Sequence, residues 1–133
     1  MLLINDVPIN CINQAAIQYH VPATMIVSVL RTENGRLGQA NHNKDGSYDL
    51  GPMQINSHWL QRLSRYGYTQ QDLQYNPCIN VTIGTWILAS EIANGQSLWN
   101  GVGDYHSHTT YHNFQYQYQV KTAYSKLLNA INT

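Results

Sequence analysis

Apolar residues recur with a helical period between positions 22 and 33, and this apolar stripe ends on a glutamate. Pro22 is expected in the first turn of the helix and Gly35 just beyond its end. Four apolar residues lie three, four, seven and eight positions before Glu33, so a helix places them on the face that carries its carboxyl group. These residues are Met25, Ile26, Val29 and Leu30. The pattern predicts that Glu33 continues a buried face, where an ionised carboxylate is costly.

Burial gives Glu33 a candidate chemical role. A carboxyl group in an apolar setting keeps its proton to a higher pH than in water, and a general acid must be protonated near neutral pH. Raising its pKa from about 4.3 to about 6 requires about 2.3 kcal/mol of differential environment. The alternative is a glutamate that faces solvent or pairs with Arg31 or Arg36, as is common near helix ends.

Cap and turn residues divide the rest of the chain into short elements. Lys44 to Ser47 (KDGS) predicts a turn, with a short hairpin or an irregular insertion after Glu33. Asn76 and Pro77 predict the start of a helix that ends at Gly95. That helix is apolar on nearly all sides and is therefore expected at the buried centre of the fold. The other expected elements are a helix over 11–19 capped by Asn10, one over 58–66 capped by Asn56 or Ser57 and stopped by Gly67, a turn over 69–73, a short piece over 99–105 and a final helix.

The final element is ambiguous at its start. Its later apolar positions keep helical spacing, whereas the residues before them alternate with period two, which is typical of a strand. The helical positions are Val120, Tyr124, Leu127, Leu128 and Ile131, and the alternating ones are Phe114, Tyr116, Tyr118 and Val120. The whole pattern predicts a small, mainly α-helical domain over residues 1–133.

The amino-acid composition excludes several classes of function for this chain. The chain has seven basic and seven acidic residues and no net charge, so no basic stripe indicates nucleic acid and no charge run indicates a disordered tail. No stretch is long and apolar enough to span a membrane. Polarity comes from uncharged side chains and ten tyrosines. Such surfaces suit carbohydrate, although a generic exported protein with tyrosines in its core fits the same composition.

Cys11 and Cys78 are the only cysteines. Two cysteines without a CxxC motif are too few for a structural zinc site. A disulfide would close a loop of 68 residues, contribute about 4 kcal/mol and indicate an oxidising compartment. The alternative is two buried thiols. We expect the disulfide and an exported, periplasmic protein, although the first residues (MLLIN) form no proper signal peptide.

The chain resembles the lytic transglycosylases of the lysozyme-like superfamily, and most closely their small branch associated with secretion, pilus and conjugation machines. The apolar helix ending in Glu33 and the GPMQIN motif at 51–56 are the specific signal, and the resemblance covers nearly the whole chain. The other matching positions are Asn43, Gly46, Ser47, Asp49, Leu50, Trp59, Cys11, Asn76, Pro77, Cys78 and the tyrosine turn at Tyr105, His106 and Ser107.

The resemblance implies an α+β lysozyme-like fold and cleavage of the β-1,4 bond between N-acetylmuramic acid and N-acetylglucosamine in peptidoglycan. It implies that Glu33 acts first as acid and then as base, leaving a 1,6-anhydro end. It further implies that Tyr105 orients Glu33 or the sugar. It also implies a bridge between the two cysteines, peptidoglycan strands and components of a transport machine as partners, and a monomer without a cofactor. The residues expected beside the substrate are Asn34, Gly51, Met53 and Gln54.

Three departures from the family pattern concern the site. Asn34 replaces a common serine, Pro52 removes one backbone N–H from the usual GLMQ, and His106, Ser107 and His108 replace an Asn-Ala-Gly type of turn. None of these removes the proposed acid.

Asp49 is a candidate second carboxylate. It either stabilises positive charge at the sugar or recruits water, as in a two-carboxylate lysozyme, or it caps the following turn through backbone amides. We favour the turn cap. A hydrolytic muramidase and a non-catalytic peptidoglycan-binding scaffold are the alternative functions.

Three further groups receive a structural interpretation. Glu91 is expected to be structural. No metal site is expected from His106, His108 and His112, because they lie in a loop with no visible further ligand. Asn80 begins a glycosylation motif that falls inside the predicted central helix, so we expect it to stay unmodified.

Overall fold

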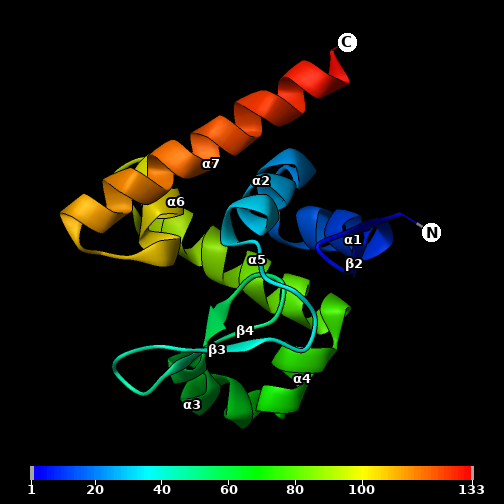
Figure 1. Ribbon diagram of the computed structural model, residues 1–133, viewed down its shortest axis with the longest axis vertical. Helices are drawn as coiled ribbons and strands as arrows, with labels where there is room; N and C mark the ends of the chain where they lie inside the picture. The colour runs from blue at the N-terminus through cyan, green and yellow to red at the C-terminus, as the bar shows by residue number, and fades with distance from the viewer. Residues whose placement is uncertain (1, 133) are drawn as a thin grey trace.

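The computed structural model describes residues 2–132, and most of them are helical (Figure 1). Two short antiparallel sheets accompany the helices. In chain order the elements are β1 (Leu3–Ile4), β2 (Val7–Pro8), α1 (Ile9–Tyr19), α2 (Ala23–Glu33), β3 (Ala40–His42), β4 (Tyr48–Leu50), β5 (Ile55–Asn56), the 3-10 turn η1 (Ser57–Trp59), α3 (Leu60–Leu63), the 3-10 turn η2 (Ser64–Tyr66), α4 (Gln70–Tyr75), α5 (Pro77–Asn94), α6 (Leu98–His106) and α7 (Thr110–Ile131). Within this part of the chain, no helix has the length and apolar character needed to cross a membrane.

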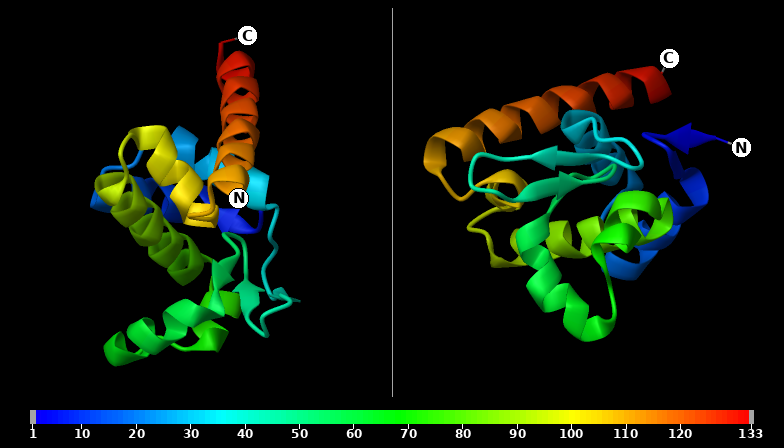
Figure 2. Two further views of the ribbon diagram at one scale, coloured as in Figure 1. Left: turned by 90° about the vertical axis from the view of Figure 1, so that its left-hand side faces the viewer. Right: turned by 60° about the horizontal axis from the view of Figure 1, so that its bottom comes forward.

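Helix α5 is the buried centre, as the sequence predicted. The side chain of Asn76 accepts a hydrogen bond from the Ile79 amide, and Pro77 follows as the first helical residue. Figures 1 and 2 show α5 crossing the molecule, with α1, α2, α6 and α7 on one side and β3–β5, α3 and α4 on the other. The buried residues of α5 are Asn80, Val81, Ile83, Gly84, Thr85, Ile87 and Leu88.

The insertion after α2 contains the expected hairpin. Strands β3 and β4 pair antiparallel, with Asn41 opposite Asp49, and β5 pairs with β4 on its other side. Gly46 adopts a left-handed conformation (φ 87°) in the connecting turn, and the Ser47 amide donates to the Asp45 carboxylate. These contacts fix one wall of the site described below.

A buried asparagine joins the two sides of the molecule. Asn80 of α5 is fully buried and accepts a hydrogen bond from the Met53 amide at 2.9 Å. Its own amide group donates to the carbonyls of Leu50 at 2.9 Å and Leu73 at 2.8 Å. One side chain therefore forms hydrogen bonds with three buried backbone groups, which holds α4 and the turn after β4 against α5.

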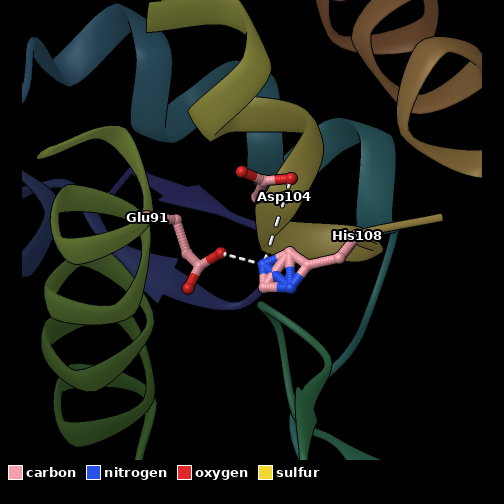
Figure 3. A group of neighbouring side chains, drawn as sticks. All are labelled: Glu91, Asp104 and His108. Atoms are coloured by element: carbon pink, nitrogen blue, oxygen red, sulfur yellow. Dashed lines mark hydrogen bonds and ion pairs between the residues drawn. The ribbon is translucent and has the colours of Figure 1, made fainter. Parts of the chain in front are cut away.

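The predicted disulfide is confirmed. Cys11 and Cys78 are bonded, which ties α1 to the first turn of α5. A second tie lies at the other end of α5. There Glu91 accepts a hydrogen bond from the ring of His108, which follows α6, at 2.7 Å (Figure 3). Glu91 is therefore a packing residue between α5 and α6, as expected.

Several sequence-based boundaries were wrong. Helix α1 begins at Ile9 after Pro8, not after Asn10, because the β1–β2 hairpin leads directly into it. Gly35 lies just beyond the end of α2, as expected, but the residue that adopts a left-handed conformation there is Asn34 (φ 54°). Gly35 instead lies against the carbonyl oxygens of Gly51 and Pro52, where a Cβ atom would collide with both. The ambiguous start of the last element is helical, since α7 runs unbroken from Thr110.

Candidate active site

A cleft of about 390 Å³ lies between α2, the β3–β5 sheet and the end of α6. One of its sides carries Glu33, and the other carries polar side chains of the sheet. Its lining residues are Glu33, Asn43, Asp45, Ser47, Asp49, Gln54, Ile55, Asn56, Trp59, Ile87, Tyr105 and His106. Glu33 and Asp49, the two carboxylates singled out from the sequence, therefore face the same space.

Glu33 is the last residue of α2, so the apolar stripe of that helix carries its carboxyl group into the cleft. The hydroxyl of Tyr116 donates a hydrogen bond to its Oε2 atom at 2.6 Å. Burial raises the pKa of Glu33 to about 7. The Tyr116 hydrogen bond opposes this rise because it favours the carboxylate, and the negative charge of Asp49 adds to the rise. Glu33 is thus a carboxylic acid that is still largely protonated just below neutral pH.

Two tyrosines lie near this acid, and Tyr105, which was expected to orient Glu33 or the sugar, is not its hydrogen-bond partner. Tyr105 lines the cleft, but its hydroxyl donates to the Met53 carbonyl at 2.8 Å. The hydrogen bond to Glu33 comes from Tyr116 of α7, whose ring stacks on His106 at a centroid distance of 4.8 Å. Burial raises the pKa of both tyrosines, so both remain protonated donors at neutral pH.

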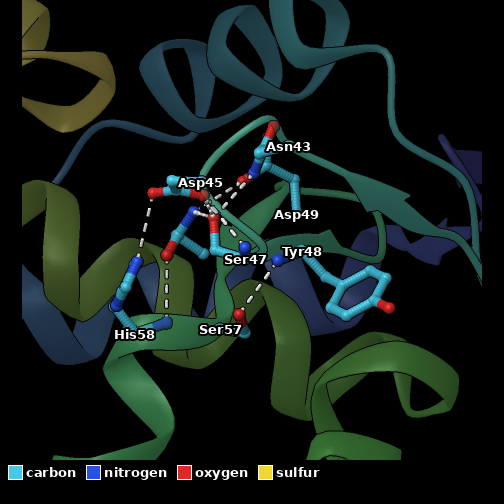
Figure 4. Close-up of polar contacts among 8 residues, drawn as sticks. Asn43, Asp45, Ser47, Tyr48, Asp49, Ser57 and His58 are labelled. Carbon is cyan, nitrogen blue, oxygen red and sulfur yellow. Dashed lines mark hydrogen bonds and ion pairs between the residues drawn. The ribbon is translucent and has the colours of Figure 1, made fainter.

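The opposite wall is a network of uncharged amides and two carboxylates (Figure 4). The Asn56 amide donates to Ser47 at 3.0 Å and to the Asp49 carboxylate at 3.1 Å, and Ser47 donates to Asp45 at 2.6 Å. Asn43 donates to the Ser47 hydroxyl at 3.0 Å. The Ser47 hydrogen bonds hold the pKa of Asp45 down at about 2, so this residue is ionised and no proton donor.

The turn-cap interpretation of Asp49 was wrong. Among residues 2–132, the hydrogen bond that Asp49 receives comes from the side chain of Asn56, its cross-strand neighbour in β5, and not from backbone amides of the following turn. The cap in this region is Asp45, which accepts from the Ser47 amide. Asp49 is therefore left facing the cleft.

Of the four residues expected beside the substrate, the structure places only Gln54 in the cleft lining. Met53 is fully buried and packs against Gly84 of α5. Gly51 is also buried, and its left-handed conformation (φ 66°) serves close packing against Asn80 rather than approach by a ligand. Asn34 is exposed and ends α2.

One group of side chains has the residue types of a metal site. Glu91, Asp104 and His108 bring one ligand atom each within 4.8 Å of one another, outside the cleft (Figure 3). Two ligands bound about 2.1 Å from one tetrahedral zinc ion lie about 3.4 Å apart. The 2.7 Å between Glu91 and His108 is instead a hydrogen-bond distance, and Asp104 is already held by the Asn113 amide at 2.8 Å. The arrangement fits an ion pair better than a metal centre.

Sequence reasoning missed Tyr116, the residue that contacts the acid. The signal was present, because Asn113, Tyr116, Gln117 and Val120 have helical spacing and are the buried residues of α7. The helical signal was not recognised because residues 114–120 also alternate with period two, as in a strand. Two members of that pattern, Phe114 and Tyr118, are exposed in the structure.

Known proteins share this sequence pattern. Residues 10–128 match the family described as "Transglycosylase SLT domain". "Invasion protein IagB" of Salmonella typhimurium is 33% identical over 111 residues, which cover 83% of this chain and 69% of that protein. "Protein IpgF" of Shigella flexneri is 29% identical over 102 residues, covering 76% and 67%. A "Peptidoglycan-binding-like protein" of Escherichia coli O157:H7 is 27% identical over 129 residues, covering 88% and 77%. Because the family match spans most of a mainly helical chain with a protonatable glutamate in its cleft, this protein belongs to the SLT transglycosylase family and is a peptidoglycan lytic transglycosylase.

Proposed function

We propose that this enzyme cleaves the MurNAc-β-1,4-GlcNAc bond with Glu33 as its single acid and base and leaves a 1,6-anhydro product. Glu33 donates its proton to the glycosidic oxygen as the bond from that oxygen to C1 breaks. The C6 hydroxyl of the same muramoyl residue then attacks C1, and its proton returns to the Glu33 carboxylate. No water is consumed, and Glu33 ends the cycle protonated.

The single observation that carries this proposal is the environment of Glu33. Its pKa of about 7 suits a group that must both give and take a proton near neutral pH. The Tyr116 hydroxyl supports the first half of the cycle, because a donor at 2.6 Å stabilises the carboxylate that forms when Glu33 gives up its proton. In this proposal Tyr116 is a positioning residue, while Tyr105 holds the Met53 backbone at the edge of the cleft.

The position of Asp49 in the cleft supports a second candidate function, that of a hydrolytic muramidase. It lines the same cleft as Glu33 and its charge raises the pKa of Glu33, which supports a role in stabilising charge at C1 or activating water. If it supplies such charge, Asp49→Asn costs about two decades in rate; if it only sets the pKa of Glu33, the loss stays below about tenfold.

Mass spectrometry of digested peptidoglycan distinguishes these candidates. Anhydro ends support the transglycosylase reaction, reducing ends support hydrolysis, and no products support a scaffold. Glu33→Gln is the matched variant, because it keeps the shape of the side chain and an acceptor for Tyr116. We expect it to lose about two to four decades of cleavage rate while retaining the wild-type circular dichroism spectrum. A near wild-type rate contradicts the role of Glu33.

We further propose that residues 1–133 act as one monomeric domain outside the cytoplasm, opening the wall locally for a secretion, pilus or conjugation machine. The Cys11–Cys78 bridge supports an oxidising, periplasmic setting. The similarity to a protein named for invasion supports service to a transport apparatus. Fractionation of cells followed by thiol labelling tests the location, since a bridged protein outside the cytoplasm stays unlabelled until reduced.

A further inference from the structure

A second depression, of about 440 Å³, adjoins the catalytic cleft. It is lined by His58, Trp59, Gln61, Arg62 and Arg65, and Trp59 also lines the cleft that holds Glu33. The two spaces are therefore neighbours across one side chain. We call this second depression the arginine shelf.

The arginine shelf comes from one short stretch of sequence, the continuous turns η1, α3 and η2. Arg62 and Arg65 are three residues apart, so they project from the same face. Two of the four arginines in an otherwise charge-poor chain thus gather beside the site. The Arg62 guanidinium lies 5.2 Å from the centroid of the Trp59 ring, which holds it next to the cleft.

Both guanidinium groups lack an acidic partner. Within residues 2–132, the ion pairs involve Arg36, His58 and His108, and neither Arg62 nor Arg65 takes part in one. Both side chains are exposed. Their hydrogen-bond donors are therefore available to an external anion, and a guanidinium is well suited to binding a carboxylate through two parallel hydrogen bonds.

The substrate class supplies such an anion. The sugar backbone of a glycan strand carries hydroxyl and amide groups that match the amide and hydroxyl side chains of the cleft wall. The peptide stems attached to its muramoyl residues carry free carboxylates. Cations beside this cleft match the charged stems, whereas the sugars themselves carry no such anion.

Resting on the proposed function, we infer that Arg62 and Arg65 bind carboxylates of the peptide stems of a glycan strand held in the cleft. The enzyme would then distinguish stem-bearing glycan from stripped glycan through this contact, while Glu33 carries out the chemistry.

Binding measurements in a Glu33→Gln background test this inference separately from turnover. The probes are a soluble glycan fragment with peptide stems, the same fragment with its stem carboxylates amidated, and the same fragment after an amidase has removed the stems. We expect Arg62→Gln/Arg65→Gln to weaken binding of the first probe by about tenfold and to leave the other two unchanged. The binding difference should shrink as salt is added.

The matched control is Lys121→Gln/Lys126→Gln. It also removes two positive charges, one of them a lysine placed 5.0 Å over the Trp99 ring, but from helix α7. We expect it to bind all three probes like its parent. An equal loss for all probes in the arginine variant, or no loss for any, overturns the inference. Phosphatidylglycerol vesicles are a fourth probe. If the arginine variant loses binding to these vesicles alone, the inference is also overturned, because the arginine shelf would then bind a membrane surface. If wild-type enzyme cleaves neither stemmed nor stripped glycan, the proposed function fails, whatever the binding shows.

Discussion

The protonation of Glu33 can be measured as folding stability, without any substrate. Its pKa is about 7 in the folded protein, against an ordinary value of 4.5 that we expect after unfolding. Below about pH 4 both states hold the proton, so the stability that depends on this proton is fully present. As pH rises, the unfolded chain releases the proton first, and the free energy of unfolding falls until the folded carboxyl also ionises near pH 7.

The magnitude follows from that difference. The pKa of Glu33 differs by about 2.5 between the folded and unfolded states, which corresponds to about 3 kcal/mol in the free energy of unfolding. Glu33→Gln has no proton to lose and keeps an acceptor for Tyr116, so it escapes this loss. We therefore expect the variant to match the wild type at about pH 4 and to exceed it by about 3 kcal/mol at about pH 8.

Urea unfolding followed by tryptophan fluorescence measures both proteins across this range. Every other titrating group is shared, so the difference between the two free energies isolates Glu33. A difference that stays constant from about pH 4 to about pH 8 would refute the reasoning, since it would mean that the folded protein does not hold the proton. A variant that becomes less stable than the wild type as pH rises would show that Tyr116 outweighs burial.

The remaining predictions concern the supports of the site. Tyr116→Phe removes a hydrogen bond that favours the ionised acid, so the pKa of Glu33 rises further and the falling limb of the pH–activity profile moves to higher pH; a move to lower pH contradicts the assigned contact. Asn80→Ala removes three hydrogen bonds to buried backbone groups and should cost about 3 kcal/mol or more in urea unfolding, whereas Thr82→Ala, at a half-buried position on the same helix, should cost far less. Reducing the disulfide should cost about 4 kcal/mol in the same assay, and the unreduced protein should release no titratable thiol on unfolding.

The parts of the fold that the sequence predicted are those encoded by local signals. Asn76 and Pro77 specify the start of α5 through a cap and a fixed φ angle, and the apolar stripe before Glu33 reports its burial directly. At Thr69 the sequence predicted only a turn, and the structure has the helix α4 there, begun by a capping box between Thr69 and Asp72. Each of these features depends on residues within one or two turns of each other.

The parts that it did not predict depend on contacts between distant segments. The bond between Tyr116 and Glu33 joins residues 83 positions apart, and no local pattern names that partner. Met53 and Gly51 were expected at the substrate because their motif matches the family pattern. The side chain of Met53 turns inward because Gly84, far along the chain, leaves room for it. From the sequence, Asn80 was recognised only as the start of a glycosylation motif. Its three hydrogen-bond partners lie in other segments and are known only from the fold.

The hydrogen bonds of Asn80 determine which nearby positions can be substituted without losing the contact between the two sides of the molecule. All three of its partners are main-chain atoms, belonging to Leu50, Met53 and Leu73. Any residue other than proline supplies the same N–H at position 53, and every residue supplies the same carbonyl at positions 50 and 73. Substitutions at those three sites change the packing but leave the three hydrogen bonds possible. Only the side chain at position 80 must keep its identity for this contact. The link between the two sides of the cleft can therefore persist while the residues at positions 50, 53 and 73 change.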